Sequence, residues 1–86
     1  MSTIRITIDA DDRQTVRVVE ALTGLDGVEV QVRDAREDPE AAAFLDRLVC
    51  CGPVTPVVEH AGLLLTAPSA AEALLAVRRA SPLLVG

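Results

Sequence analysis

Two adjacent thiols are the most unusual reactive groups in the sequence, because Cys50 and Cys51 are the only cysteines of the 86-residue chain. Neighbouring Cα atoms lie ~3.8 Å apart, below the ~4.4 Å that disulfides usually need, so a bridge between the two would be strained. Both lie at the end of a predicted helix, just before Gly52, and the partial negative charge at a helix C-terminus disfavours a thiolate. We therefore expect both cysteines to be poor nucleophiles. They could still exchange disulfides with a partner or bind a soft metal.

The two cysteines differ in the burial that we expect for them. Cys51 follows Phe44 by seven residues and Leu48 by three, which places it beside the apolar face of the predicted helix and favours a small buried side chain. Cys50 points roughly the opposite way, so its position is compatible with either a functional thiol or a structural one. A structural zinc site usually has four ligands at wider spacing than two adjacent thiols provide. We therefore assign no metal to the two cysteines.

Carboxylates and one histidine are the other candidates for chemistry. Asp9, Asp11 and Asp12 could be hard-cation ligands, but they lack the turn glycine and the later glutamate of a calcium loop, so we expect them to cap the following helix. His60 is expected in a solvated hairpin turn, and no serine or cysteine can be assigned to it for a triad. The sequence has no glycine-rich phosphate loop or other cofactor motif, so no cofactor is expected.

The charge and hydropathy patterns exclude several kinds of partner. The chain has a net charge of −5, no lysine and a single aromatic residue, so it offers neither clustered positive charge nor stacking platforms for nucleic acid. No apolar run approaches ~18 residues, and the N-terminal sequence lacks the basic and apolar regions of a secretory signal. We expect a cytoplasmic protein without membrane contact, in which the cysteines are free thiols.

The elements that must position these groups begin with a β-α-β unit. Isoleucines alternate with polar residues over 4–8, which is the period of a strand with one buried face. Apolar residues at helical spacing over 16–22 predict a helix that Gly24 ends. Alternation returns over 28–33 as a second strand, and a strand, helix and strand of this length predict parallel strands with a right-handed crossover.

The second half of the chain is predicted to begin with a helix and a hairpin. Asp38-Pro39 is a strong helix start, and Gly52-Pro53 is an equally strong stop. Two short strands are expected at 55–59 and 63–66, and a turn at 60–62 joins them.

A third helix completes a single α/β domain. Ser69 and Glu72 form a capping-box pattern ahead of an apolar run, which predicts the start of that helix. Residues 1–86 then form one domain of order βαβαββα, with an apolar tail at 82–86. The alternative ferredoxin-like order βαββαβ would need the second strand to turn directly into a third, and the Asp38-Pro39 helix start argues against it.

Two stretches of the second half are similar to glutaredoxins, which belong to the thioredoxin superfamily. The sequence DPEAAAFLDRL resembles the helix that follows the family's second strand, and CCGPVTPVVEHAGLLLT resembles its glycine-containing turn, threonine–proline loop and hairpin. The resemblance implies a thioredoxin-like fold, with a four-stranded mixed sheet and helices on both faces. It also implies that Pro56 is the cis-proline that faces the active site, and that Thr55 before it belongs to the binding site.

The dithiol of that family is missing. Active members carry Cys-X-X-Cys or Cys-X-X-Ser between the first strand and the first helix, where the helix N-terminus stabilises a thiolate. Here residues 9–13 read Asp-Ala-Asp-Asp-Arg. We therefore expect a non-enzymatic module that binds a protein or peptide partner near Thr55 and Pro56. The alternative is an atypical glutaredoxin-like thiol protein, in which Cys50 and Cys51 are the catalytic residues for thiol–disulfide exchange or bind a soft metal.

Overall fold

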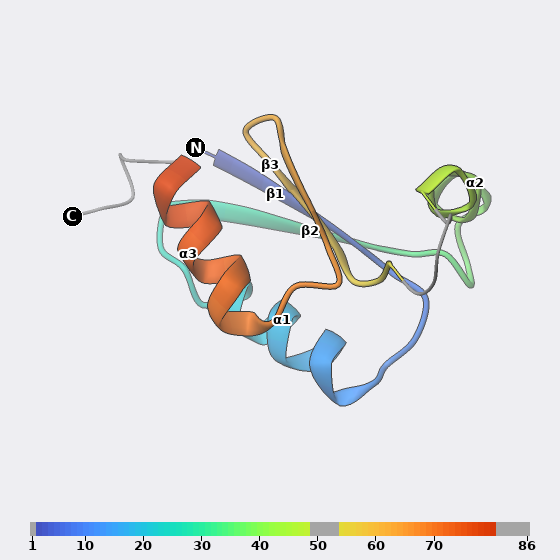
Figure 1. Cartoon of the computed structure of the whole chain (residues 1–86), viewed down its shortest axis with the longest axis horizontal. Coiled ribbons are helices and arrows are strands. Elements are labelled where there is room, and N and C mark those ends of the chain that lie inside the picture. Colours follow the sequence, from blue (N-terminus) through green and yellow to red (C-terminus); the bar gives the residue numbers. More distant parts are fainter. Residues whose placement is uncertain (1, 49–53, 81–86) are drawn as a thin grey trace.

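The chain alternates strands and helices in the predicted order. The computed structural model describes residues 2–48 and 54–80 (Figure 1). Along the chain the elements are β1 (Ser2–Ile8), α1 (Arg13–Thr23), β2 (Val28–Asp34), α2 (Pro39–Leu48), β3 (Val57–His60), β4 (Leu63–Thr66) and α3 (Ala70–Ala80). The ferredoxin-like alternative is wrong, because the segment that would have been its third strand is the helix α2.

The four strands form one mixed sheet in the order β2-β1-β3-β4. β1 and β2 are parallel, as the crossover through α1 requires, and their register runs from Ser2 opposite Val28 to Ile8 opposite Asp34. β3 pairs antiparallel with both β1 and β4. The carboxyl ends of β1 and β2 and the amino end of β3 therefore lie at the same end of the sheet.

One face of the sheet carries the hydrophobic core. The alternating isoleucines of β1 are buried, as their period predicts, and α1 and α3 pack next to each other over that face (Figure 1). The core cluster consists of Ile4, Ile6, Ile8, Val18, Leu22, Val58, Ala73 and Val77. Burying an aliphatic side chain of this size stabilises a fold by about 1.5–3 kcal/mol. The stability of the domain therefore comes chiefly from this aliphatic layer.

Helix α2 lies on the other side of the sheet, near the end of β2 (Figure 1). Its buried residues Ala41 and Leu45 are not part of the core cluster. Its N-terminus is capped as predicted, because the Asp38 carboxylate accepts a hydrogen bond of 2.9 Å from the Glu40 backbone N–H. Burial by itself raises the pKa of Asp38, but a hydrogen bond from Arg33 and the capping N–H groups together lower it below its ordinary value.

Helix α3 begins with the predicted capping box. The Ser69 backbone N–H donates to the Glu72 carboxylate at 3.1 Å, and the Glu72 backbone N–H donates to the Ser69 hydroxyl oxygen at 3.1 Å. The hydrogen bond from the Ser69 backbone N–H, and secondarily the Ser69 side chain, lower the pKa of the Glu72 carboxylate. The N-terminus of α3 is thus satisfied by its own residues.

The start of α1 and the place of His60 differ from expectation. Asp12 stands at the N-cap position of α1, but its carboxylate makes no capping hydrogen bond and accepts the Thr15 hydroxyl instead. His60 belongs to β3 and is only 4% exposed, with its Nδ1 3.3 Å from the Thr3 carbonyl oxygen, so the expected solvated turn position is wrong. The turn consists of Ala61 and Gly62, both with positive φ, and this shorter turn places His60 within the sheet.

Candidate functional site

Three connections meet at the end of the sheet where β1 and β2 finish. The loop 9–12 leads from β1 to α1 on one side of the sheet, and the loop 35–38 leads from β2 to α2 on the other (Figure 1). Neighbouring parallel strands whose connections leave to opposite sides form a crevice, where α/β sheets characteristically bind ligands. The segment 54–56 enters β3 at the same end, because β3 is antiparallel to β1. We treat this end of the sheet as the candidate site.

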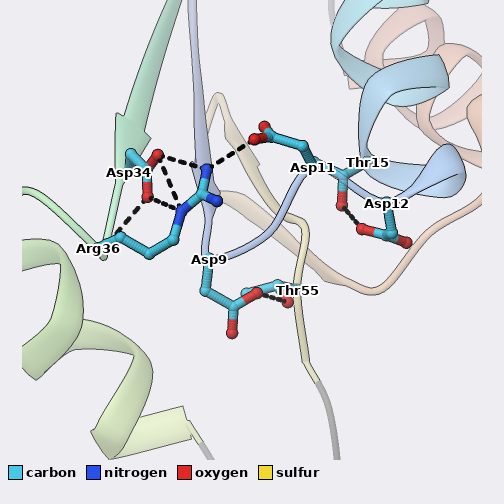
Figure 2. Close-up of polar contacts among 7 residues, drawn as sticks. All are labelled: Asp9, Asp11, Asp12, Thr15, Asp34, Arg36 and Thr55. Atoms are coloured by element: carbon cyan, nitrogen blue, oxygen red, sulfur yellow. Dashed lines mark hydrogen bonds and ion pairs between the residues drawn. The ribbon is translucent and has the colours of Figure 1, made fainter.

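Arg36 ties the first two of these connections together. Its Nη2 donates to a carboxylate oxygen of Asp34 at 2.8 Å and to one of Asp11 at 3.0 Å, as Figure 2 shows. The Arg36 backbone N–H also donates to Asp34 at 2.9 Å, which closes a local turn. The Arg36 side chain, and secondarily its backbone N–H, hold the pKa of Asp34 below its ordinary value. Asp34 and Asp11 in turn raise the pKa of Arg36.

A second contact joins the β1–α1 loop to the segment before β3. The Thr55 hydroxyl donates a hydrogen bond of 2.7 Å to Asp9, which lies beside it in Figure 2. With Asp11 bound to Arg36 and Asp12 bound to Thr15, each of the three aspartates contacts a side chain. The expectation that these carboxylates cap α1 is therefore wrong. Asp9 and Asp11 make tertiary contacts instead. Asp12 stands at the N-cap position, but its carboxylate accepts the Thr15 hydroxyl and no backbone N–H.

The Thr55–Pro56 peptide bond is cis, which is the isomer that the resemblance implied. Pro56 is buried and Thr55 is partly exposed. The Ala67 backbone N–H donates to the carbonyl oxygens of Val54 at 2.8 Å and of Pro56 at 3.0 Å, and Gln14 donates to the Ala67 carbonyl oxygen at 3.0 Å. These bonds fix the residues on both sides of Thr55. The backbone N–H and carbonyl of Thr55 itself make no hydrogen bond within the described ranges.

The structure brings together some of the predicted site residues and leaves others untested. Thr55 and Pro56 lie at the candidate site, next to Asp9. Cys50 and Cys51 lie outside the described residues, so their predicted roles stay predictions.

Sequence reasoning missed two residues that organise the site, Arg36 and Gln14. The Asp34-Ala35-Arg36 spacing is a usable signal for the first, because an aspartate often accepts the N–H two residues on. Its second partner, Asp11, is 25 residues away and has no local signal. Gln14 reaches a carbonyl 53 residues away, which only the folded arrangement of α1 and the β4–α3 connection creates.

The carboxylates, guanidinium and hydroxyl of the site can bind a ligand through hydrogen bonds and charge. Across residues 2–48 and 54–80, no cluster of three or more histidine, cysteine or acidic side chains is arranged to hold a metal ion. The same ranges contain no helix of sufficient length and apolar character to cross a membrane. Comparisons with models of known protein families, with curated proteins and with solved structures find no match to this chain.

Proposed function

We propose that this chain is a thioredoxin-like module without a dithiol, which binds an extended segment of a partner protein beside Thr55. The observation that carries the proposal is the backbone of Thr55. Its N–H and carbonyl are not used within the described part of the fold, whereas its hydroxyl is held by Asp9 and its two neighbours are held by Ala67. The element order and the sheet order β2-β1-β3-β4 also favour a thioredoxin-like arrangement.

A backbone segment that is fixed in position, and whose N–H and carbonyl groups are not already hydrogen-bonded, can pair with an extended peptide. Strand addition of this kind takes its affinity from main-chain hydrogen bonds and its specificity from the surrounding side chains. Because the residues on both sides of Thr55 are already fixed, pairing costs little further ordering of this chain. Each hydrogen bond formed contributes a net stabilisation of about 0.5–1.5 kcal/mol.

The charges around Thr55 define the partner segment. The residues drawn in Figure 2 include the carboxylates of Asp9, Asp11, Asp12 and Asp34 but only one guanidinium, that of Arg36, which contacts Asp11 and Asp34. These residues together carry an excess of negative charge. A segment that carries lysine or arginine next to its extended stretch complements this charge. Because Asp11 and Asp9 are exposed, the attraction weakens as salt is added. The absence of a cysteine from residues 9–13 supports a binding module over a dithiol oxidoreductase.

The test starts from peptides selected on the purified chain from a random display library. In a ¹⁵N-labelled sample, the selected peptide should shift the Thr55 amide resonance and slow its hydrogen exchange. Thr55→Pro removes the N–H and should weaken binding by about tenfold, the equivalent of one good hydrogen bond. Thr55→Val keeps the N–H, loses only the contact with Asp9, and should weaken binding less. Far-UV circular dichroism establishes that both variants fold. Full affinity in the Thr55→Pro variant, or resonance shifts confined to other elements, would overturn the proposal.

The thiol alternative makes a different prediction for the same peptides. If Cys50 or Cys51 forms a mixed disulfide or binds a soft metal, the double variant Cys50→Ser/Cys51→Ser loses that activity. The binding module keeps its peptide affinity in the same variant. Loss of peptide binding on replacement of the two cysteines therefore favours the thiol protein.

A further inference from the structure

The strand β2 forms one edge of the sheet and is unusually regular for an edge. All seven of its residues pair one-to-one with β1, from Val28 to Asp34, so it contains no bulge. It also contains no proline, and Val32 is 46% exposed. Proteins usually protect an edge strand by shortening it, bending it or placing proline on it, because an open edge pairs with other strands. β4, at the other edge, is only four residues long.

The side chains of β2 are self-complementary when two copies run antiparallel. A two-fold axis at Gln31 places Glu29 of each copy opposite Arg33 of the other, and Val30 opposite Val32. Glu29 and Arg33 lie on the same face, because they are register partners of Thr3 and Thr7 on β1. Val30 and Val32 lie on the other face, the face of Ile4 and Ile6. Opposite charges and β-branched pairs directly across a sheet both stabilise pairing. 

The alternatives to this register lose its complementarity. Sliding the two strands by two residues places Glu29, or Arg33, opposite Gln31 and shortens the overlap. A parallel in-register pairing places Glu29 opposite Glu29 and Arg33 opposite Arg33, and like charges directly opposite are destabilising. Only the antiparallel register centred on Gln31 uses all seven residues and pairs Glu29 with Arg33. The third charged residue of the strand, Asp34, then lies opposite Val28 and keeps its ion pair with Arg36.

Arg33 can take part without giving up its contacts inside the chain. Its Nε donates to Asp38 at 3.1 Å, and its Nη2 lies 3.5 Å from Glu40. Its Nη1 makes no hydrogen bond to the described residues and is available to a second carboxylate. The planar guanidinium presents five donors, which lets one arginine serve several acceptors. 

We propose that β2 is a dimerisation strand, through which two copies of this chain pair antiparallel about Gln31 and join their sheets into one. The interface of a single strand pair is smaller than the roughly 1,600 Å² of a standard stable complex, so the dimer is weak, with a dissociation constant of about micromolar or higher. Because the strands run in opposite directions, the two candidate sites lie at opposite ends of the joined sheet.

Sedimentation equilibrium over a range of concentrations of the full chain tests the proposal. The wild-type chain should show a monomer–dimer equilibrium. Glu29→Arg should weaken the dimer by about tenfold, because two attractive pairs become repulsive. The double variant Glu29→Arg/Arg33→Glu restores opposite charges and should recover most of the loss. Glu20→Arg makes the same change of net charge on the exposed side of α1 and should leave dimerisation unchanged.

Three results would overturn the proposal. A dimer that Glu29→Arg does not weaken uses another surface. A strictly monomeric protein whose β2 amides are all protected from hydrogen exchange has its edge covered by its own chain. A strictly monomeric protein in which alternate β2 amides exchange freely leaves this edge to a different partner.

Discussion

The sheet is closed differently at its two ends. At the end where β3 turns into β4, the chain reverses through Ala61 and Gly62, and the positive φ of these two residues makes the turn. At the end that carries the candidate site, side chains from distant parts of the sequence make the closure. Thr55 bonds Asp9, which is 46 residues away, and Gln14 bonds a carbonyl 53 residues away.

This difference separates what stability depends on from what the proposed function depends on. A turn closed by backbone responds to substitutions that change the allowed φ, and it is indifferent to charge. A site closed by exposed carboxylates and hydroxyls responds to charge and pH, and it contributes little to global stability because solvent screens its ion pairs. The site can therefore change without loss of the fold.

Gly62→Val should have the largest effect on stability of the variants that we consider. Gly62 has φ +82°, where a β-branched residue is strongly disfavoured, although the space around it is open. We expect a loss of about 2 kcal/mol of unfolding free energy. Urea titration followed by far-UV circular dichroism measures it, since the chain has no tryptophan or tyrosine.

Gly24→Ala is the control for that substitution. Gly24 ends α1 with φ −77°, and an added Cβ would meet its nearest heavy atom at 3.6 Å, an ordinary contact. Its stability should stay within about 0.5 kcal/mol of wild type. An equal loss in both variants would mean that the glycines act through packing and not through φ.

Thr7→Val should raise stability. The Thr7 side chain is 1% exposed, and its hydroxyl has no hydrogen-bond partner among the described residues. Removing a buried polar group without a partner is expected to stabilise the fold by about 1 kcal/mol. Thr15→Val is the matched control, because Thr15 is equally buried but donates to Asp12, so the same change should lower stability. A loss of stability in the Thr7 variant would indicate a bound water that satisfies the hydroxyl.

Ala61→Gly should give a smaller gain at the turn end. Ala61 has φ +49°, a conformation that costs an L-residue more than it costs glycine. Glycine loses more chain entropy than alanine on folding, which offsets part of this benefit. We therefore expect the free energy of unfolding, measured by urea titration, to rise by about 0.5 kcal/mol. Ala71→Gly, on the exposed side of α3, should instead lose about 1 kcal/mol. If both variants lose stability, the positive φ of Ala61 carries no strain.

The sequence predicted features that depend on neighbouring residues better than it predicted contacts between distant ones. The β1 isoleucines, the Asp38 cap and the capping box at Ser69 were all read from local patterns, because hydrophobic period and caps involve residues a few positions apart. The predicted turn began one residue too early and therefore included His60. The reason is that Ala61 adopts a positive φ, which is uncommon for alanine and could not be expected from its residue type.

At the site end, the Thr55–Pro56 segment was predicted only because a resemblance pointed to it. Thr55 and Pro56 came from that source, and the contacts of Asp9, Asp11 and Gln14 did not. Each of those contacts joins residues at least 25 positions apart. Helix propensity and charge near a helix start favoured capping by the aspartates, and tertiary hydrogen bonds overrode that local preference.

The pH dependence of stability should show the smallest effect and should come from the site end. Arg36 lowers the pKa of Asp34 in the folded chain from its ordinary 3.8, so the folded state binds fewer protons than the unfolded state. The stabilisation by Asp34 is therefore complete above pH 3.8 and disappears as the pH falls through the lowered pKa. Asp34→Asn should be slightly less stable than wild type at pH 7, and the difference should vanish in acid.

Thermal unfolding of both proteins between pH 7 and pH 2 measures this difference. Asp26→Asn is the control, because Asp26 is exposed in the turn before β2 and has no hydrogen bond or ion pair to the described residues. It shows what the loss of one carboxylate does without an arginine contact. If Asp34→Asn and Asp26→Asn change the melting temperature equally at every pH, the Arg36 cluster does not hold the site end together in solution, and the contrast between the two ends of the sheet fails.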